Sequence, residues 1–282
     1  MPNNETRFPC RKADSVSVDA FYLPTERGQR FCVLHPAEGT RRGAVLYAHP
    51  FGDEMNKSRR MAALQARAFA RSGWDVLQID LYGCGDSCGE FRDATWETWI
   101  GDVRTAWEWM ERRTQAPVWL WGLRTGCLLA VAAARARAAP AQLLFWQPVL
   151  SGQRYLQQFL RTRLAGEAIE GQARRDTAAL REALARDGVL EVSGYALSAD
   201  LAQGMNTAWL EMPPRGSEVR WIEVLPHAGQ PLSEAAQRQA ALWNGDGCRT
   251  STTTTVGPPF WQTQEISECP ALIASTISSM PQ

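Results

Sequence analysis

The stretch Gly122-Leu123-Arg124-Thr125-Gly126 decides the fold that this sequence predicts. The apolar run 117–121 before it is typical of a buried strand, and the alanine-rich segment 127–138 after it favours a helix. Two glycines around a central residue, between a strand and a helix, form the pattern of a nucleophile elbow, a sharp turn that exposes the central side chain above the end of a sheet. The usual central residue is serine. Here it is Arg124, which cannot attack a carbonyl carbon.

Short apolar runs alternate with helical patterns along the chain, which predicts an α/β fold with a mostly parallel central sheet flanked by helices. Strands are expected at 16–23, 30–35, 44–48, 75–80, 117–121, 141–146, 219–225 and 250–256, the first two as an antiparallel pair. Helices are expected at 58–72, 96–110, 127–138 and 234–244, and residues 269–279 fit either a final helix or an irregular tail. Tryptophans at helical spacing within 96–110 indicate a buried stripe of the core rather than a ligand site.

The pattern changes after Pro148. Residues 151–215 contain polar helical stretches rich in arginine and glutamine, and no obvious strand of the main sheet. We therefore expect residues 13–150 and 216–282 to form the core, with residues 151–215 inserted between them as a helical cap. Because its polar stretches lack the apolar content for a core of their own, we expect a mobile cap rather than a second domain.

Composition and charge exclude several classes of function. The 282 residues are 45% hydrophobic and carry a formal net charge of zero, which gives no electrostatic argument for a nucleic-acid partner. The first residues lack the apolar segment of a secretion signal, and no stretch reaches the roughly 18 apolar residues of a membrane span, so we expect a cytoplasmic protein. Cys84 and Cys88 lack the second ligand pair of a structural zinc site, and neither a metal nor a cofactor is predicted.

Two loops that precede the elbow in the sequence indicate which protein family this chain resembles. One expected strand leads into the loop His49-Pro50-Phe51-Gly52, and the next leads into Asp80-Leu81-Tyr82-Gly83-Cys84-Gly85-Asp86-Ser87. The elbow follows these two loops. This order of strands, loops and elbow resembles the α/β-hydrolase superfamily, and the resemblance covers nearly the whole chain. More narrowly, 48–54, the elbow and 258–265 resemble the exosortase A system-associated hydrolase of the second type. That family is encoded with exopolysaccharide and protein-sorting machinery in certain Gram-negative bacteria, so the resemblance implies a hydrolase fold and a place in such a system.

The resemblance also implies roles for the residues of these loops. In many esterases of the superfamily, a backbone N–H of the loop after the third strand joins the N–H after the nucleophile to hold an oxyanion. The donors here would be Phe51 and Thr125, since Pro50 has no N–H. His49 is the candidate base, with a structural role in ordering its loop as the alternative. The pocket loops would contribute Gly52, Asp53, Asp86 and Ser87.

The acid and the histidine of a catalytic triad should follow late in the chain. After the strand at 219–225 the sequence reads Pro226-His227-Ala228-Gly229-Gln230, and after the last strand, where superfamily members carry histidine, it reads Gly257-Pro258-Pro259-Phe260-Trp261. Pro259 cannot accept a proton, and His227 precedes the position that the triad order requires. Ser87, Thr125 or Cys127 with His49 as base, or an elimination that needs no covalent step, are the alternative chemistries.

Arg124 needs a negative partner at the start of its helix. The helix N-terminus already offers unpaired N–H groups and a positive dipole end, so a guanidinium there favours an anion. A partly buried arginine without a partner costs several kcal/mol, and either an anionic ligand or a nearby carboxylate must neutralise it. The carboxylates on neighbouring loops are Asp53, Glu54, Asp86 and Glu90.

These observations favour a degenerate hydrolase without Ser-His-Asp catalysis. It would bind an anionic or acyl-sugar ligand, or a protein partner, in an exopolysaccharide pathway. One alternative is a genuine hydrolase or acyltransferase that acts on a small ester or thioester through unorthodox residues. Another is a pure interaction module, which would show a salt-bridged pocket and a large apolar surface patch. Arg124 and Pro259 leave the question of enzymatic activity open.

Overall fold

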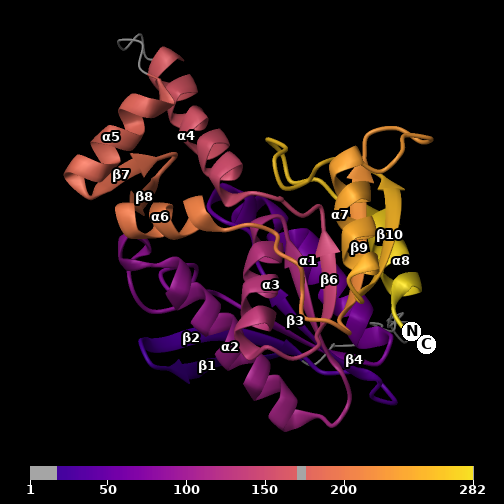
Figure 1. Cartoon of the computed structure of the whole chain (residues 1–282). Coiled ribbons are helices and arrows are strands. Elements are labelled where there is room, and N and C mark those ends of the chain that lie inside the picture. The colour runs from indigo at the N-terminus through magenta and orange to yellow at the C-terminus, as the bar shows by residue number, and fades with distance from the viewer. Residues whose placement is uncertain (1–17, 170–175, 282) are drawn as a thin grey trace, which may run out of the picture.

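An eight-stranded sheet forms the centre of the protein (Figure 1), a computed structural model that describes residues 18–169 and 176–281. Its strand order is β1-β2-β4-β3-β5-β6-β9-β10, in which β1 and β2 are antiparallel to each other, β2 is antiparallel to β4, and the remaining neighbours are parallel. The fold class expected from the sequence is confirmed, although positions 16 and 17 of the first expected strand lie outside the described residues. The strands are β1 (Asp19–Thr25), β2 (Gly28–His35), β3 (Gly43–Ala48), β4 (Trp74–Ile79), β5 (Val118–Leu123), β6 (Gln142–Trp146), β9 (Glu218–Leu225) and β10 (Arg249–Val256).

Helices cover both faces of this sheet, which explains why every residue of β3 and β5 is buried. Helices α1 (Asp53–Arg71) and α8 (Pro270–Ser279) pack on one face, so the last segment is helical, which is one of the two alternatives that the sequence left open. Helices α2 (Trp96–Arg113), α3 (Thr125–Arg137) and α7 (Glu234–Gly245) pack on the other. The tryptophan stripe of α2 lies in that second layer as core, as its spacing predicted.

Helix α1 begins five residues earlier than the sequence pattern suggested, at Asp53 rather than Ser58. Gly52 makes the turn from β3 with φ 58° and ψ −136°, a conformation that glycine adopts without steric cost. Asp53 and Glu54 then occupy the first helical turn, where their charge complements the helix dipole. The early start places the Glu54 carboxylate beside the end of the sheet.

The segment between β6 and β9 contains helices, as the sequence predicted, and a small hairpin that was not predicted. Its elements are α4 (Gly152–Ile169), α5 (Thr177–Asp187), β7 (Val189–Val192), β8 (Tyr195–Ser198) and α6 (Ala199–Thr207). In Figure 1 they stand beside the upper end of the sheet. Buried side chains of this segment, such as Leu180, Leu197 and Met205, belong to the same cluster as the core under α2 and α3. The segment therefore shares the core of the sheet.

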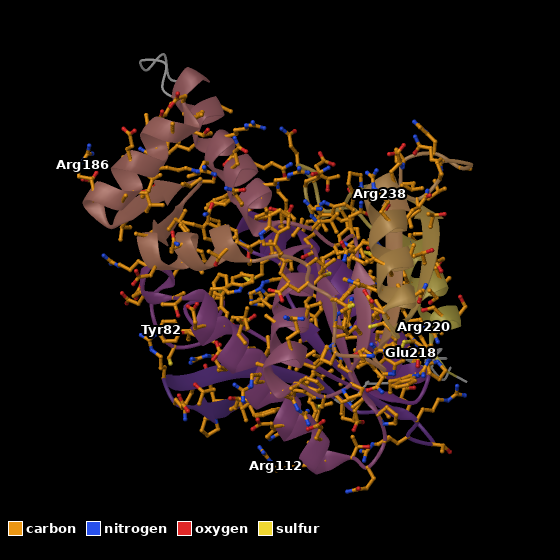
Figure 2. The ribbon with its side chains drawn as sticks, viewed as in Figure 1. Tyr82, Arg112, Arg186, Glu218, Arg220 and Arg238 are labelled. Carbon is orange, nitrogen blue, oxygen red and sulfur yellow. The ribbon has the colours of Figure 1, made fainter. Side chains whose placement is uncertain are left out.

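Many charged side chains lie at the periphery of the molecule, although a few, such as Arg30 and Asp102, are buried. Figure 2 shows Arg112, Arg186 and Arg238 at the outer ends or faces of their helices, while other side chains fill the space between helices and sheet. Within the described residues, no helix is both long enough and apolar enough to cross a membrane.

Candidate functional site

The turn from β5 into α3 has the backbone of a nucleophile elbow. Arg124 occupies its tip with φ 55° and ψ −116°, a conformation that few residues other than glycine adopt. A Cβ atom on Gly122 would lie 2.6 Å from the Cα atom of Cys127, and one on Gly126 would collide with the carbonyl oxygen of Ala48. The two glycines are therefore required by close backbone packing, and the elbow presents an arginine.

The Arg124 guanidinium forms an ion pair with Glu54. Its Nε atom lies 3.3 Å from Oε1 and 3.4 Å from Oε2 of that carboxylate, and each side chain is 15% exposed. The Nη1 atom donates to the carbonyl oxygen of Gln147 at 3.5 Å. Of the four carboxylates that the sequence offered, Glu54 is the partner, whereas Asp53 pairs with Lys57 at 2.8 Å.

Two aromatic rings complete the surroundings of the guanidinium. Its central carbon lies 5.6 Å from the ring centroid of Trp261 and 5.9 Å from that of Tyr155, within the range of cation–π attraction. Burial raises the pKa of Glu54, and the Arg124 charge opposes this rise. Tyr155 comes from α4 and Trp261 from the loop after β10, so segments far apart in the sequence meet at this point. Neither ring was predicted.

A cavity of about 410 Å³ opens beside the ion pair. Two acidic and two basic side chains line it, so its formal charge sums to zero. Aromatic rings and uncharged polar groups form the rest of its wall. The lining residues are Asp53, Glu54, Lys57, Arg124, Tyr155, Gln158, Phe159, Thr162, Ser193, Trp261 and Gln262. The cavity can hold a small molecule between α1, the segment that follows β6 and the loop after β10.

The Phe51 N–H, for which the resemblance implied a role in holding an oxyanion, has a partner within the protein. It donates a hydrogen bond of 2.8 Å to the Thr125 hydroxyl, and both residues are buried. The Thr125 side chain therefore occupies the donor that an esterase would keep for its reaction intermediate. Gly52 lies next to this contact, under the ring of Phe159.

His49 is bound on both sides by backbone groups. Its Nδ1 atom donates to the carbonyl oxygen of Pro50 at 2.8 Å, and its Nε2 atom accepts from the N–H of Leu81 at 3.2 Å. Burial lowers the pKa of His49, which keeps the ring neutral. No ring nitrogen is left to take a proton, so the geometry fits the structural alternative and not the candidate base.

The other candidate nucleophiles are also engaged. The Ser87 hydroxyl donates to the carbonyl oxygen of Asp80 and accepts from the N–H of Phe31, and the Asp86 N–H donates to the Asp80 carboxylate at 3.1 Å. Ser87 and Asp86 thus order the loop after β4 and do not line the cavity beside Arg124. Cys127 is fully buried, and burial raises the pKa of its thiol well above the ordinary value.

The late part of the chain supplies no base at this site. His227 is exposed in the loop after β9, and Pro259 stands half-buried after β10. Glu223, inside β9, is buried and accepts hydrogen bonds from the N–H and the hydroxyl of Ser233, the N-cap residue of α7. Its carboxylate therefore supports a helix start. Across 18–169 and 176–281, no three histidine, cysteine or acidic side chains gather as a metal site would need.

Sequence comparison places this architecture in a known family. A family model described as serine aminopeptidase, S33, matches residues 39–179, half of the chain. The chain belongs to this family of α/β hydrolases. No curated protein sequence matches it.

Solved structures of other α/β hydrolases share the fold. This α/β hydrolase superposes on Est1E of Butyrivibrio proteoclasticus with bound ferulic acid at a TM-score of 0.63 and 16% identity, over 92% of this chain and 96% of that one. A thermostable carboxyl esterase of Bacillus coagulans gives 0.61 and 14%, over 93% and 97%. GrgF, an α/β hydrolase of a Penicillium species, gives 0.58 and 16%, over 93% and 97%. At such identities the likeness is one of fold.

Proposed function

We propose that this α/β hydrolase binds a ligand beside Arg124 and does not hydrolyse it by Ser-His-Asp chemistry. The observation that carries the proposal is the Arg124–Glu54 ion pair at the tip of the elbow, where the attacking group of a hydrolase belongs. Losing a triad costs on the order of a millionfold in turnover, and the oxyanion hole accounts for much of the remnant. Here the Phe51 N–H of that hole is also occupied.

The same contacts argue against an unorthodox hydrolase. Ser87 and Thr125 are held by hydrogen bonds to the backbone, Cys127 is buried, and His49 has both ring nitrogens occupied. A nucleophile needs a base within hydrogen-bond reach, and these groups face other partners.

The charge balance of the cavity supports an acyl-sugar over an anionic ligand. Glu54 already neutralises Arg124, and Asp53 neutralises Lys57, so an added anion would meet no unmatched charge. Gln158, Thr162 and Gln262 offer hydrogen bonds to hydroxyl groups, while Phe159 and Trp261 offer apolar surface to an acyl chain. The resemblance to the exosortase-associated family supports a role in an exopolysaccharide system.

Two measurements test this function together. Short-chain aryl esters are assayed beside an active α/β hydrolase, and binding of octanoyl glucose is measured by calorimetry, with glucose and octanoate as controls. We expect no ordinary esterase turnover, and we expect the intact ester to bind more tightly than either half. Turnover within about a hundredfold of the active enzyme would overturn the proposal in favour of a genuine hydrolase.

A matched pair of variants on α4 locates the binding. Gln158 lines the cavity, whereas Gln153 is also exposed on α4 and does not line it. Gln158→Ala should weaken binding of octanoyl glucose about fivefold, because about 1 kcal/mol of hydrogen bonding is lost, and Gln153→Ala should leave it unchanged. If the ester and its halves all fail to bind, the ligand proposal fails and the pure interaction module takes its place.

A further inference from the structure

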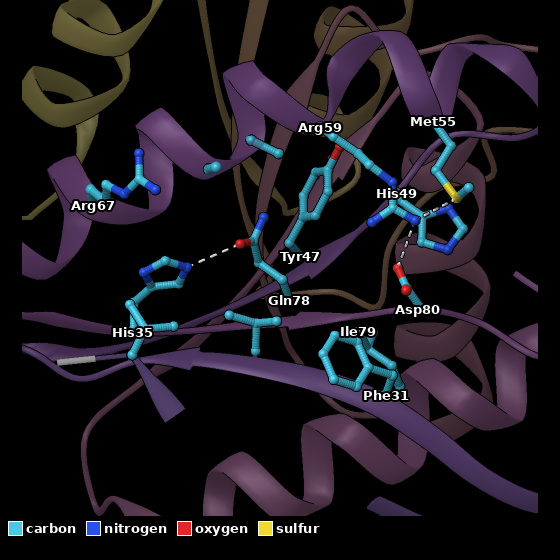
Figure 3. A pocket seen from close by; sticks show the side chains of 14 residues that line it. Phe31, His35, Tyr47, His49, Met55, Arg59, Arg67, Gln78, Ile79 and Asp80 are labelled. Atoms are coloured by element: carbon cyan, nitrogen blue, oxygen red, sulfur yellow. Dashed lines mark hydrogen bonds and ion pairs between the residues drawn. The ribbon is translucent and has the colours of Figure 1, made fainter. Parts of the chain in front are cut away.

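A second cavity adjoins the Arg124 cavity along α4. It has a volume of about 390 Å³ and lies between α4 and the hairpin of β7 and β8, which are side by side in Figure 1. Thr162 and Ser193 line both cavities. By contrast, the cavity of about 300 Å³ in Figure 3, where Arg59 faces Asp80, has no lining residue in common with the Arg124 cavity. The two cavities along α4 are therefore neighbouring parts of one groove.

Two hydroxyl groups form the boundary between these neighbouring cavities. The Oγ1 atom of Thr162 donates its single proton to the carbonyl oxygen of Phe159 at 2.7 Å, and it lies 2.9 Å from the Oγ atom of Ser193. Ser193 therefore donates to Thr162, and its oxygen can still accept a hydrogen bond. Both residues are exposed, so a ligand that crosses the boundary can contact these hydroxyl groups.

The turn of the hairpin is held against α4. Ser193 and Gly194 form this turn with φ 50° and 83°, the left-handed conformations that a two-residue hairpin turn requires. Besides the bond between Ser193 and Thr162, the Arg163 guanidinium of α4 donates to the carbonyl oxygen of Glu191 in β7. Two hydrogen bonds thus fix the hairpin on the helix, and the walls of the second cavity are preorganised for a ligand.

The walls of the two cavities differ in chemical character. Three aromatic rings line the Arg124 cavity, those of Tyr155, Phe159 and Trp261. In the second cavity the lining side chains are charged or carry a hydroxyl group, and the other lining residues are glycines. This set consists of Thr162, Arg163, Gly166, Glu167, Glu191, Ser193 and Gly194. The groove therefore changes from partly aromatic to polar along α4, as the two ends of an amphiphilic ligand would need.

We propose that the second cavity binds a further sugar ring of an acylated glycan, an inference that rests on the function proposed above. The acyl chain contacts Phe159 and Trp261, and the first ring reaches Thr162 at the boundary. The next ring then lies beyond Thr162, where the exposed carboxylate of Glu191 accepts hydrogen bonds from its hydroxyl groups. A Cβ atom on Gly166 would meet open space, which leaves room for the ring. The groove therefore binds an acylated disaccharide more tightly than an acylated monosaccharide.

Calorimetry with the whole protein compares octanoyl glucose with octanoyl maltose, in which a second glucose ring is joined to the acylated one. We expect octanoyl maltose to bind about fivefold more tightly, because the second ring gains hydrogen bonds in the polar cavity. Equal affinity for the two esters, or weaker binding of octanoyl maltose, would overturn this inference and leave the proposed function intact. Failure of both esters to bind would overturn the proposed function, and this inference with it.

A matched pair of carboxylate variants locates the second ring. Glu191 lines the second cavity, whereas Glu182 is exposed on α5 and lines neither cavity. Glu191→Ala should weaken binding of octanoyl maltose about fivefold and leave binding of octanoyl glucose unchanged, because the first ring does not reach this carboxylate. Glu182→Ala should change neither affinity. Equal effects of the two variants on octanoyl maltose would reject the second cavity as its site. Gln158→Ala, in the first cavity, should weaken both esters.

Discussion

Two arginine–carboxylate pairs of this protein resemble each other in chemistry and differ in access to solvent. Arg30 of β2 and Asp102 of α2 lie 2.7 Å apart, with side chains 0% and 3% exposed. Arg124 and Glu54 lie 3.3 Å apart, both 15% exposed, at the wall of a cavity. The first pair also borders a surface cavity, of about 450 Å³, but both of its side chains are covered, and we call it the sealed pair. The Tyr82 N–H also donates to Asp102 at 2.8 Å.

The difference separates a structural ion pair from one that a ligand can reach. The side chains of the sealed pair have almost no contact with water, so removing one partner strands a charge that water cannot reach. A pair whose side chains are partly exposed, such as Arg124 and Glu54, keeps contact with solvent or ligand, and its groups remain available for recognition. Burial, not the presence of a salt bridge, thus decides which role an arginine has in this fold.

The sealed pair should give the largest loss of stability. Arg30→Met strands the Asp102 carboxylate, and we expect the free energy of unfolding to fall by about 3–5 kcal/mol. Urea denaturation of both proteins measures this. Adding Asp102→Leu should recover part of the loss, because the stranded charge is then gone. A single variant as stable as the wild type would show that the pair is not sealed.

Arg124→Met should have a smaller effect. Water in the cavity can solvate Glu54 once its partner is lost, so we expect a loss of about 2 kcal/mol, below the range for fully buried pairs. The same denaturation series measures it. A loss equal to that of Arg30→Met would mean that the cavity wall is as closed as the interior, and no loss would mean that Glu54 has no need of Arg124.

The contribution of Glu54 to the free energy of unfolding should decrease as the pH rises, which is opposite to the usual behaviour of a paired carboxylate. Because burial raises its pKa above the ordinary value of 4.5, the folded protein holds this proton more tightly than the unfolded chain does. Its contribution to stability is present below 4.5 and is lost as the pH rises through the folded pKa. Glu54→Gln should remove this decline. Unfolding midpoints are compared across the acid range, and parallel curves for the two proteins would contradict the shift.

An ion pair on the surface should give the smallest loss in the free energy of unfolding. Arg238 and Glu234 lie 3.7 Å apart on α7, with side chains 76% and 86% exposed (Figure 2 marks Arg238). We expect Arg238→Met to change the free energy of unfolding by about 0.5 kcal/mol or less, since water screens the pair. A larger loss would show that replacing any arginine with methionine destabilises this protein, and the losses at Arg30 and Arg124 could then not be assigned to burial.

The strands of the sheet could be predicted from regular apolar patterns, whereas the short turns could not. Apolar runs such as 44–48 and 117–121 marked the parallel strands, because a strand buried on both faces has no polar alternation. The hairpin of β7 and β8 was missed, although Ser193-Gly194 between two short alternating runs is a turn signal, with φ 50° and 83° in the structure. The start of α1 was placed late because the stretch after Gly52 is polar.

The parts of the site that lie in one short segment could be predicted from the sequence, whereas the contacts between distant segments could not. The elbow and its arginine were evident from Gly122 and Gly126. Glu54 was one of four candidate carboxylates, and the start of α1 selects it. Tyr155 and Trp261 carry no motif, and their approach to Arg124 depends on how distant segments fold together. No local pattern in the sequence encodes such a contact.

The hydrogen bond from the Phe51 N–H to the Thr125 hydroxyl also bears on the evolutionary history of this chain. Under the proposed function, an ancestral hydrolase would have lost its attacking group when arginine replaced serine at position 124. It would have lost the free Phe51 N–H, an oxyanion donor, when it acquired Thr125. Reversion at position 124 alone would meet an occupied N–H and Pro259 in place of a base. Under the proposed function, each such change would therefore make the earlier ones harder to reverse.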